Sequence, residues 1–191
     1  MKLTSAESIV IETERLLLSE LTPKLMHELF TECSDEEIIT YMGFASQDIL
    51  DAEKKKFRKG ISSYYYTFKN FRILDKTDQK VLGRCDFHTW VRHHRRAEIG
   101  YHLLDDSSKN KGIMSEALAP ILAFGFERMQ LYRIEAMVAS YNEPSLKLLQ
   151  KFGFTLEGNL RGHYVVNGVN EDSLVHSLLL PEFEKFEKFG K

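Results

Sequence analysis

A short polar loop containing one glycine carries the clearest chemical signal in this chain. The loop and the first helical residues after it occupy positions 109–115 (KNKGIMS), close behind a strand-like run at 97–104. The first N–H groups of a helix have no partner within the helix, so they can bind an anion. Lys109 and Lys111 add positive charge beside these groups. The pattern predicts a binding site for a ligand that carries a pyrophosphate.

Other kinds of chemistry lack the residues they would need. No cluster of His, Cys and Asp stands at the spacing of a metal site, and the chain has neither a Gly-x-Ser-x-Gly turn nor a Walker phosphate loop. Cys33 and Cys85 form no redox motif, so we expect reduced thiols in packing roles. The sequence therefore predicts neither a resident metal nor thiol chemistry.

The elements that must position the loop alternate between helical and strand periodicity. Helices are predicted at residues 23–32, 35–41, 47–66, 113–129 and 143–152. Strands are predicted at residues 15–21, 71–75, 81–90, 97–104, 133–140, 154–157, 164–166 and 172–180. Pro23 suits a first helical turn, Gly153 a helix end, and Asn167-Gly168 a tight turn. This order predicts a mixed α/β (α+β) fold, with helices on both faces of a largely antiparallel central sheet.

Length and charge narrow the class of protein. A chain of 191 residues is usually one domain and can bury a substantial core. The net charge of -2 gives no general attraction to nucleic acid or membranes, so neither is an expected partner. No run is long and apolar enough to cross a bilayer, and residues 1–14 lack the apolar core of a signal peptide. We therefore expect a cytoplasmic protein.

Several motifs together resemble the GNAT N-acetyltransferases over residues 13–180. In chain order they are 13–18 (TERLLL), 97–101 (AEIGY), 109–117 (KNKGIMSEA), 142–145 (NEPS), 151–154 (KFGF), 157–158 (EG), and 166–168 (VNG) with Asp172. The middle four resemble the acetyl-CoA site of the family. The first and the last two resemble the branch that contains ribosomal-protein N-terminal (alanine/serine) acetyltransferases. Order and spacing, rather than any single motif, carry the resemblance.

The resemblance implies a GNAT-like sheet in which the strand at 97–104 is bulged and splays from its neighbour. Its backbone could then bond the pantetheine amides as an extra strand would, and Gly100 suits the bulge. The loop would hold the pyrophosphate, although Lys109, Asn110 and Met114 replace the Gln or Arg, the Gly, and the Gly or Ala usual there. The residues implied for binding acetyl-CoA, as co-substrate, are Tyr101, His102, Leu103, Lys109, Asn110, Lys111, Gly112, Ile113, Met114, Ser115, Asn142 and Ser145.

The resemblance also divides the chain and suggests catalytic groups. It implies an N-terminal extension at 1–12, the acetyltransferase domain at 13–181 and a polar C-terminal tail at 182–191. An amine is mostly protonated at pH 7, and Glu98 could take its proton, directly or through water. Leu149 replaces the Tyr that many family members use as an acid, whereas the branch has a Ser at position 145 as the proposed donor to the thiolate. Both residues have ordinary explanations too: Glu98 as a structural carboxylate and Ser145, with Asn142, as a helix cap.

Other groups remain candidates on the acceptor side. Tyr164 stands where some members of the branch carry a Glu proposed as base, and solvent could serve instead. His88 and His163 could relay protons, although lone histidines are more often structural. The stretch at 54–71, with three consecutive tyrosines at 64–66, could line an acceptor groove or simply pack as a helix.

The resemblance implies an acetyl-CoA-dependent N-acetyltransferase, with the amine attacking directly in a ternary complex. The expected acceptor is a protein N-terminal α-amine, such as that of a ribosomal protein. A small amine (a polyamine, an antibiotic or an amino acid) is the alternative acceptor, and a non-catalytic acyl-CoA-binding module is the alternative class. Many relatives form dimers, so a homodimer is also an expectation.

Overall fold

The computed structural model describes residues 8–58 and 69–189. The chain divides into two compact units, one made of residues 1–88 and 100–121 and the other of residues 89–99 and 122–191. The second half of the predicted helix at 47–66, and the three tyrosines at 64–66, lie outside the described residues.

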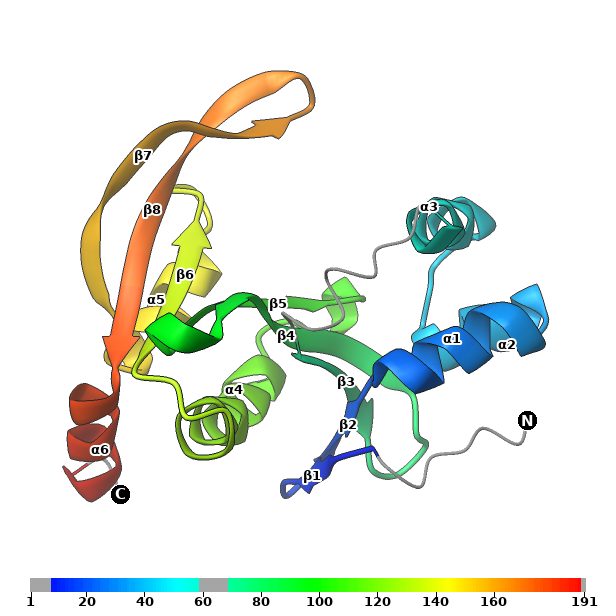
Figure 1. The fold of residues 1–191 in the computed structure, drawn as a ribbon, viewed down its shortest axis with the longest axis horizontal. Helices are drawn as coiled ribbons and strands as arrows, with labels where there is room; N and C mark the ends of the chain where they lie inside the picture. Colours follow the sequence, from blue (N-terminus) through cyan, green and yellow to red (C-terminus); the bar gives the residue numbers. More distant parts are fainter. Residues whose placement is uncertain (1–7, 59–68, 190–191) are drawn as a thin grey trace. The chain divides into compact units, whose positions relative to one another are not determined.

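The predicted mixed α/β fold with a largely antiparallel sheet is confirmed. The described strands are β1 (Val10–Glu12), β2 (Leu16–Glu20), β3 (Lys69–Asp75), β4 (Val81–Val91), β5 (Arg96–Leu103), β6 (Arg133–Val138), β7 (Thr155–Val166) and β8 (Val169–Leu179). They hydrogen-bond in the order β1-β2-β3-β4-β5-β6-β8-β7 (Figure 1). The pairing of β5 with β6 is parallel, whereas β2 with β3, and β6 with β8, are antiparallel. The β5 strand contributes residues to both units.

The first unit contains α1 (Pro23–Glu32), α2 (Asp35–Met42) and α3 (Gln47–Arg58), and local capping signals set the ends of α1 and α2. Thr22 caps α1 through a bond from the Leu25 N–H, and Ser34 and Glu37 form a capping box on α2. Gly43 ends α2 with a φ of 70°. These helices bury one apolar cluster: Leu21, Leu25, Leu29, Ile38, Met42 and Leu50.

Two arginines, Arg72 on β3 and Arg84 on β4, hydrogen-bond the C-terminal end of α2. Arg72 is buried and Arg84 is partly buried. The Arg72 Nη1 donates to the Tyr41 carbonyl at 2.7 Å, and the Arg84 Nη2 donates to the Met42 carbonyl at 3.1 Å. The Arg72 guanidinium also lies 3.6 Å from the Tyr41 ring centroid. Cations at a helix C-terminus are favourable because the terminal carbonyls carry partial negative charge. These contacts give the two charges a structural role.

A bulge and a glycine shape β4 within the first unit. The β3–β4 register shifts between Ile73 and Leu74, which pair with Gly83 and Val81. A Cβ on Gly83 would lie 2.4 Å from the His102 carbonyl oxygen. The backbone of β5 therefore approaches β4 at a distance that only glycine allows.

The second unit is built on β6 and β8, which pair over the full length of β6. Helix α4 (Ile113–Ala123) passes into it and ends in a π-helical turn at Phe124–Arg128, so the predicted helix at 113–129 changes type near its end. Helix α5 (Glu143–Lys151) follows β6, and Gly153 ends it with a φ of 77°. The tail forms α6 (Leu180–Phe189), where Phe183 stacks on Phe126.

The prediction of separate strands at 154–157 and 164–166 was wrong. Residues 155–166 form one continuous strand, β7, joined to β8 by a turn at Asn167 and Gly168 with φ of 50° and 81°. The β7–β8 register shifts at two places, between Leu156 and Gly158 and between Leu160 and Tyr164. The shifts let the strand continue through glycines that resemble turn residues in the sequence.

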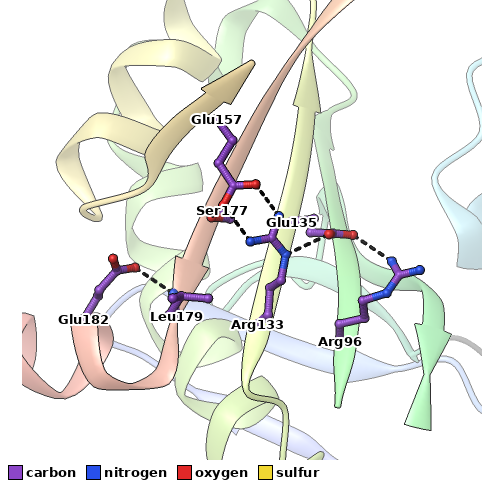
Figure 2. Close-up of polar contacts among 7 residues, drawn as sticks. All are labelled: Arg96, Arg133, Glu135, Glu157, Ser177, Leu179 and Glu182. Atoms are coloured by element: carbon purple, nitrogen blue, oxygen red, sulfur yellow. Dashed lines mark hydrogen bonds and ion pairs between the residues drawn. The ribbon is translucent and has the colours of Figure 1, made fainter. Parts of the chain in front are cut away.

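An ion-pair network ties four strands of the second unit together (Figure 2). The Arg133 side chain bonds Glu157 at 2.6 and 2.5 Å and Glu135 at 2.8 Å. Arg96 bonds the other oxygen of Glu135 at 2.9 Å, and Ser177 donates to Glu157 at 2.6 Å. The network thus joins β5, β6, β8 and β7 through charge-assisted hydrogen bonds.

This network predicts a pH-dependent stability. Hydrogen bonds from Arg133 and Ser177 lower the pKa of Glu157 to about 2. The stabilisation should therefore be complete above the ordinary Glu pKa of about 4.3 and be lost as the pH falls towards 2. At pH 7 we expect Glu157→Gln to cost about 1 kcal/mol, a value kept small because the carboxylate is 40% exposed. The measurement is the melting temperature of both proteins between pH 7 and pH 2.5.

The matched control is Glu143→Gln, which removes an exposed carboxylate paired with Lys147 at 3.3 Å. We expect it to change the melting temperature little. If the difference in melting temperature between Glu157→Gln and the wild type stays constant from pH 7 to pH 2.5, the network is not the cause of the pH-dependent stability.

Candidate functional site

Strand β5 carries Glu98 at the point where its pairing with β6 ends. The recorded parallel pairs run from Arg96 with Arg133 to Glu98 with Glu135, whereas β6 itself continues to Val138. Ala97 and Ile99 are buried on one face, and Glu98 between them is half-buried. Alternation along the strand therefore sets the Glu98 carboxylate on the opposite face from the apolar core.

The charge of Glu98 acts on Tyr164, and both residues belong to the second unit. Partial desolvation raises the pKa of Tyr164, and the negative charge of Glu98 raises it further. A phenol with a raised pKa stays protonated at neutral pH and can donate a hydrogen bond but not accept a proton. His163 is exposed and packs against Tyr164, with 4.4 Å between ring centroids. The raised pKa makes Tyr164 unsuited to the role of base.

His88 pairs with Asp86 in the first unit. The His88 Nδ1 and the Asp86 Oδ2 lie 2.9 Å apart on the same face of β4. A Cβ on Gly100 would lie 3.0 Å from the His88 Cε1 and 3.3 Å from the Asp86 Oδ1. The glycine predicted to suit a bulge thus makes room for this pair.

The predicted pantetheine-binding residues Tyr101, His102 and Leu103 form the last part of β5, in the first unit. Partial desolvation lowers the pKa of His102, and the charge of Arg84 lowers it further. The lowered pKa favours the neutral form of the His102 ring at pH 7. The backbone carbonyl of the same residue is the group that lies close to Gly83.

The predicted pyrophosphate loop lies between a short 3₁₀ turn (Asp106–Ser108) and the start of α4. Asn110 and Gly112 both have left-handed backbone, with φ of 58° and 75°. Asn tolerates this conformation better than most residues, which explains how it replaces a glycine here. Lys109 pairs with Asp106 at 2.6 Å, and Ile113, Met114 and Ser115 form the first turn of the helix.

Arg15 and Glu116 adjoin this loop and were not among the predicted site residues. The Arg15 Nε donates to a Glu116 oxygen at 2.6 Å, and the Arg15 Nη1 donates to the Lys111 carbonyl at 3.1 Å. The signal available in the sequence was the joint presence of the 13–18 and 109–117 motifs, which contain Arg15 and Glu116.

Asn142 caps α5 in the second unit, as its ordinary explanation required. Its Oδ1 accepts from the Ser145 N–H at 3.3 Å. The Ser145 hydroxyl is on a half-buried residue in the first turn, and Leu149, in the position of the missing Tyr, is fully buried. The helix is therefore capped by the Asn142 side chain and not by the Ser145 hydroxyl.

The predicted site residues thus fall into two sets. Tyr101 to Leu103 and Lys109 to Ser115 belong to the first unit, whereas Glu98, Asn142 and Ser145 belong to the second. Among the residues that the structure describes, no three His, Cys, Asp or Glu side chains group as metal ligands. None of the described helices is long and apolar enough to span a membrane.

Comparison with known proteins identifies the family. The acetyltransferase (GNAT) domain model matches residues 15–155, which include β5, the loop and α5. The chain belongs to the GNAT acetyltransferase family. It is an N-acetyltransferase that uses acetyl-CoA as its co-substrate and an amine as its acceptor.

Sequence relatives agree with this GNAT assignment. The N-acetyltransferase YoaA of Bacillus subtilis, whose function is uncharacterized, is 32% identical over 90% of this chain and 97% of its own length. The ribosomal protein uS5-alanine N-acetyltransferase of Escherichia coli is 26% identical over 67% of this chain and 63% of its own length.

Two solved structures share the fold. Ribosomal-protein-S5-alanine acetyltransferase from Vibrio fischeri has a TM-score of 0.68 at 20% identity, covering 92% of this chain and 98% of that one. The spermidine/spermine N-acetyltransferase SpeG from Vibrio cholerae, solved in mutant forms, has a TM-score of 0.66 at 21% identity, covering 90% of this chain and 98% of that one. At these identities the likeness concerns the fold.

Proposed function

We propose that this GNAT enzyme acetylates the N-terminal α-amine of a protein, in the manner of the ribosomal-protein acetyltransferases. The relatives named for ribosomal protein uS5 support this acceptor. The observation that carries the proposal is Glu98, a half-buried carboxylate at the end of the β5–β6 pairing, whose charge helps to raise the pKa of Tyr164. A carboxylate in that position can bind a cationic amine and remove its proton.

The donor would be held by the last residues of β5 and by the loop before α4. The N–H groups of Gly112, Ile113 and Met114 lead into the first turn of α4, and their partial positive charge suits a pyrophosphate. Gly112 has a left-handed backbone and leaves its main chain uncovered. The Met114 side chain narrows the space through which the pyrophosphate would approach the loop N–H groups. Lys111 and Lys109 add charge, and Asn142 keeps the first turn of α5 in place.

The transfer forms one bond and breaks one. Glu98 accepts a proton from the acceptor ammonium, and the amine nitrogen then forms a bond to the thioester carbonyl carbon. The bond from that carbon to sulfur breaks, and the Ser145 hydroxyl gives its proton to the departing thiolate while it regains one from the amine nitrogen, so that the products are the acetylated amine and CoA thiol. Backbone N–H groups of β5 polarise the carbonyl, because donors aimed at a developing oxyanion commonly carry a large share of catalysis.

Mass spectrometry of acetylated products tests the acceptor. We expect transfer to peptides that begin with Ala or Ser and contain an internal Lys, with the acetyl group on the N-terminal residue. The same peptides with a blocked N-terminus are the matched control and should stay unmodified. Acetylation of the internal Lys, or of no peptide, would contradict the proposal. CoA binding without transfer to any amine would indicate a non-catalytic module.

A polyamine acceptor is the second candidate. The similarity in fold to the spermidine/spermine N-acetyltransferase motivates it. Spermidine belongs in the same screen at equal concentration. A higher kcat/KM for spermidine than for the Ala and Ser peptides would replace the first candidate with the second.

Ser145→Ala gives a smaller, separate prediction. Because Asn142 and not the Ser145 hydroxyl caps α5, we expect the melting temperature to change little and kcat to fall about tenfold. Asn142→Ala is the comparison, with an expected loss of about 1 kcal/mol of stability. A Ser145→Ala enzyme with normal kcat would remove Ser145 from the proposed chemistry.

A further inference from the structure

The strongest unassigned feature near the proposed site is the guanidinium of Arg15, which lies against the loop before α4. Arg15 stands just before β2, and its Nη1 donates to the Lys111 carbonyl at 3.1 Å. A Cβ built on Gly112 would lie 3.6 Å from the Arg15 Nη2. A residue far away in the sequence thus bonds Lys111 and lies next to the open side of Gly112, the two loop residues that precede α4.

Glu116 holds that guanidinium in place. Its Oε2 accepts from the Arg15 Nε at 2.6 Å, and its Oε1 accepts from the Arg15 N–H at 2.8 Å and the Thr13 hydroxyl at 2.5 Å. Burial alone would raise the pKa of Glu116, but the hydrogen bonds from Thr13 and Arg15 bring it below its usual range. Glu116 is therefore ionised at neutral pH and serves as a fixed anchor.

Glu116 and Arg15 together hold both residues of the loop that precede α4. The Glu116 N–H bonds the Gly112 carbonyl at 2.9 Å, so Glu116 reaches the loop through its backbone and, by way of Arg15, through its side chain. The planar guanidinium fork bonds Glu116 and Lys111 at once, which a lysine ammonium on a flexible stem does less well. Lys109, by contrast, pairs locally with Asp106.

We infer that Arg15 is a positioning residue for acetyl-CoA: it fixes the Lys111 carbonyl and so presets the loop N–H groups for the pyrophosphate. The inference rests on the proposed use of this loop as the pyrophosphate site. A loop that is already ordered binds an anion without losing further conformational entropy. Without Arg15, the loop would have to lose that entropy when the pyrophosphate binds.

Isothermal titration with CoA and with 3′-dephospho-CoA tests the inference. Both probes carry the pyrophosphate, so we expect Arg15→Gln to raise the Kd of both by about tenfold, as for one lost charge-assisted bond. In turnover, the KM for acetyl-CoA should rise while kcat stays within about twofold. Arg15→Lys should fall between Arg15→Gln and the wild type, because Lys keeps the charge but not the fork.

Lys56→Gln is the matched control, because it also removes one cation and one exposed ion pair, with Glu53 at 2.5 Å on α3. It should bind CoA as the wild type does. If Arg15→Gln does not fold, Glu116→Gln provides the same test with the same expected direction. An unchanged Kd for CoA, or a loss with CoA that disappears with 3′-dephospho-CoA, would overturn the inference. Neither titration uses an acceptor, so failure of the peptide assay leaves this result intact.

Discussion

Replacing Glu98 with Gln should lower kcat about 100-fold while leaving the affinity for acetyl-CoA unchanged. The amide keeps the size of the side chain but cannot accept the proton of the acceptor amine. The deficit should be greatest at low pH and shrink as the pH rises, because at high pH a growing share of the amine is already deprotonated. The measurement is kcat and both KM values from pH 6 to about 9.5, a range that spans the pKa of about 8 of an N-terminal α-amine.

Glu127→Gln is the control for this experiment, since it removes an exposed carboxylate from the same unit. Its kcat should match that of the wild type at every pH. If Glu98→Gln also shows a normal kcat across the range, another group or solvent removes the proton. A rise in the KM for acetyl-CoA with unchanged kcat would instead place Glu98 on the donor side.

Gly83→Ala should destabilise the protein by about 3 kcal/mol and impair acetyl-CoA binding in the fraction that folds. The added Cβ would lie 2.4 Å from the His102 carbonyl oxygen, and the clashing partner is backbone that cannot rotate away. Relief requires β5 to shift at His102 and Leu103, two of the residues proposed to bind pantetheine. Chemical denaturation measures the stability, and titration with CoA measures the binding.

Gly158→Ala is the matched strand control, because a Cβ there meets no atom within 4 Å. We expect it to be neutral or slightly stabilising, since Ala restricts the unfolded chain. Equal losses in the two variants would show that the close approach of β4 and β5 does not explain the effect of Gly83→Ala.

Local signals explain where the sequence predicted the fold well. Helix α1 occupies Pro23–Glu32, the range expected from Pro23 and the apolar spacing, because its cap and its first turn depend on adjacent residues. Strand β7 was divided in the prediction because Gly158 and Gly162 resemble turn residues. The pairing with β8, made between distant residues, keeps it extended through two register shifts. The short β1 (Val10–Glu12) was missed because only its pairing with β2 defines it.

In the site too, features set by adjacent residues were predicted, and contacts between distant residues were not. The loop at 109–115 was found because a glycine and lysines before a helix are adjacent in sequence, and Asn110 and Gly112 have the backbone that such a loop needs. Arg15 and Glu116 are 101 residues apart, so nothing local connects them. The pairing of Asp86 with His88 adds a partner that the isolated histidine did not indicate.

Strand β7 has a consequence for the behaviour of the protein at high concentration. It is the last strand in the sheet order, and all twelve of its residues are exposed. A long exposed edge usually invites pairing with another polypeptide and, through it, aggregation. Here the two register shifts break the regular spacing of its hydrogen-bonding groups, and Glu157 and Arg161 place charges along it. The irregularities that concealed this strand in the sequence therefore also interrupt the backbone hydrogen-bonding pattern that edge-to-edge pairing would need.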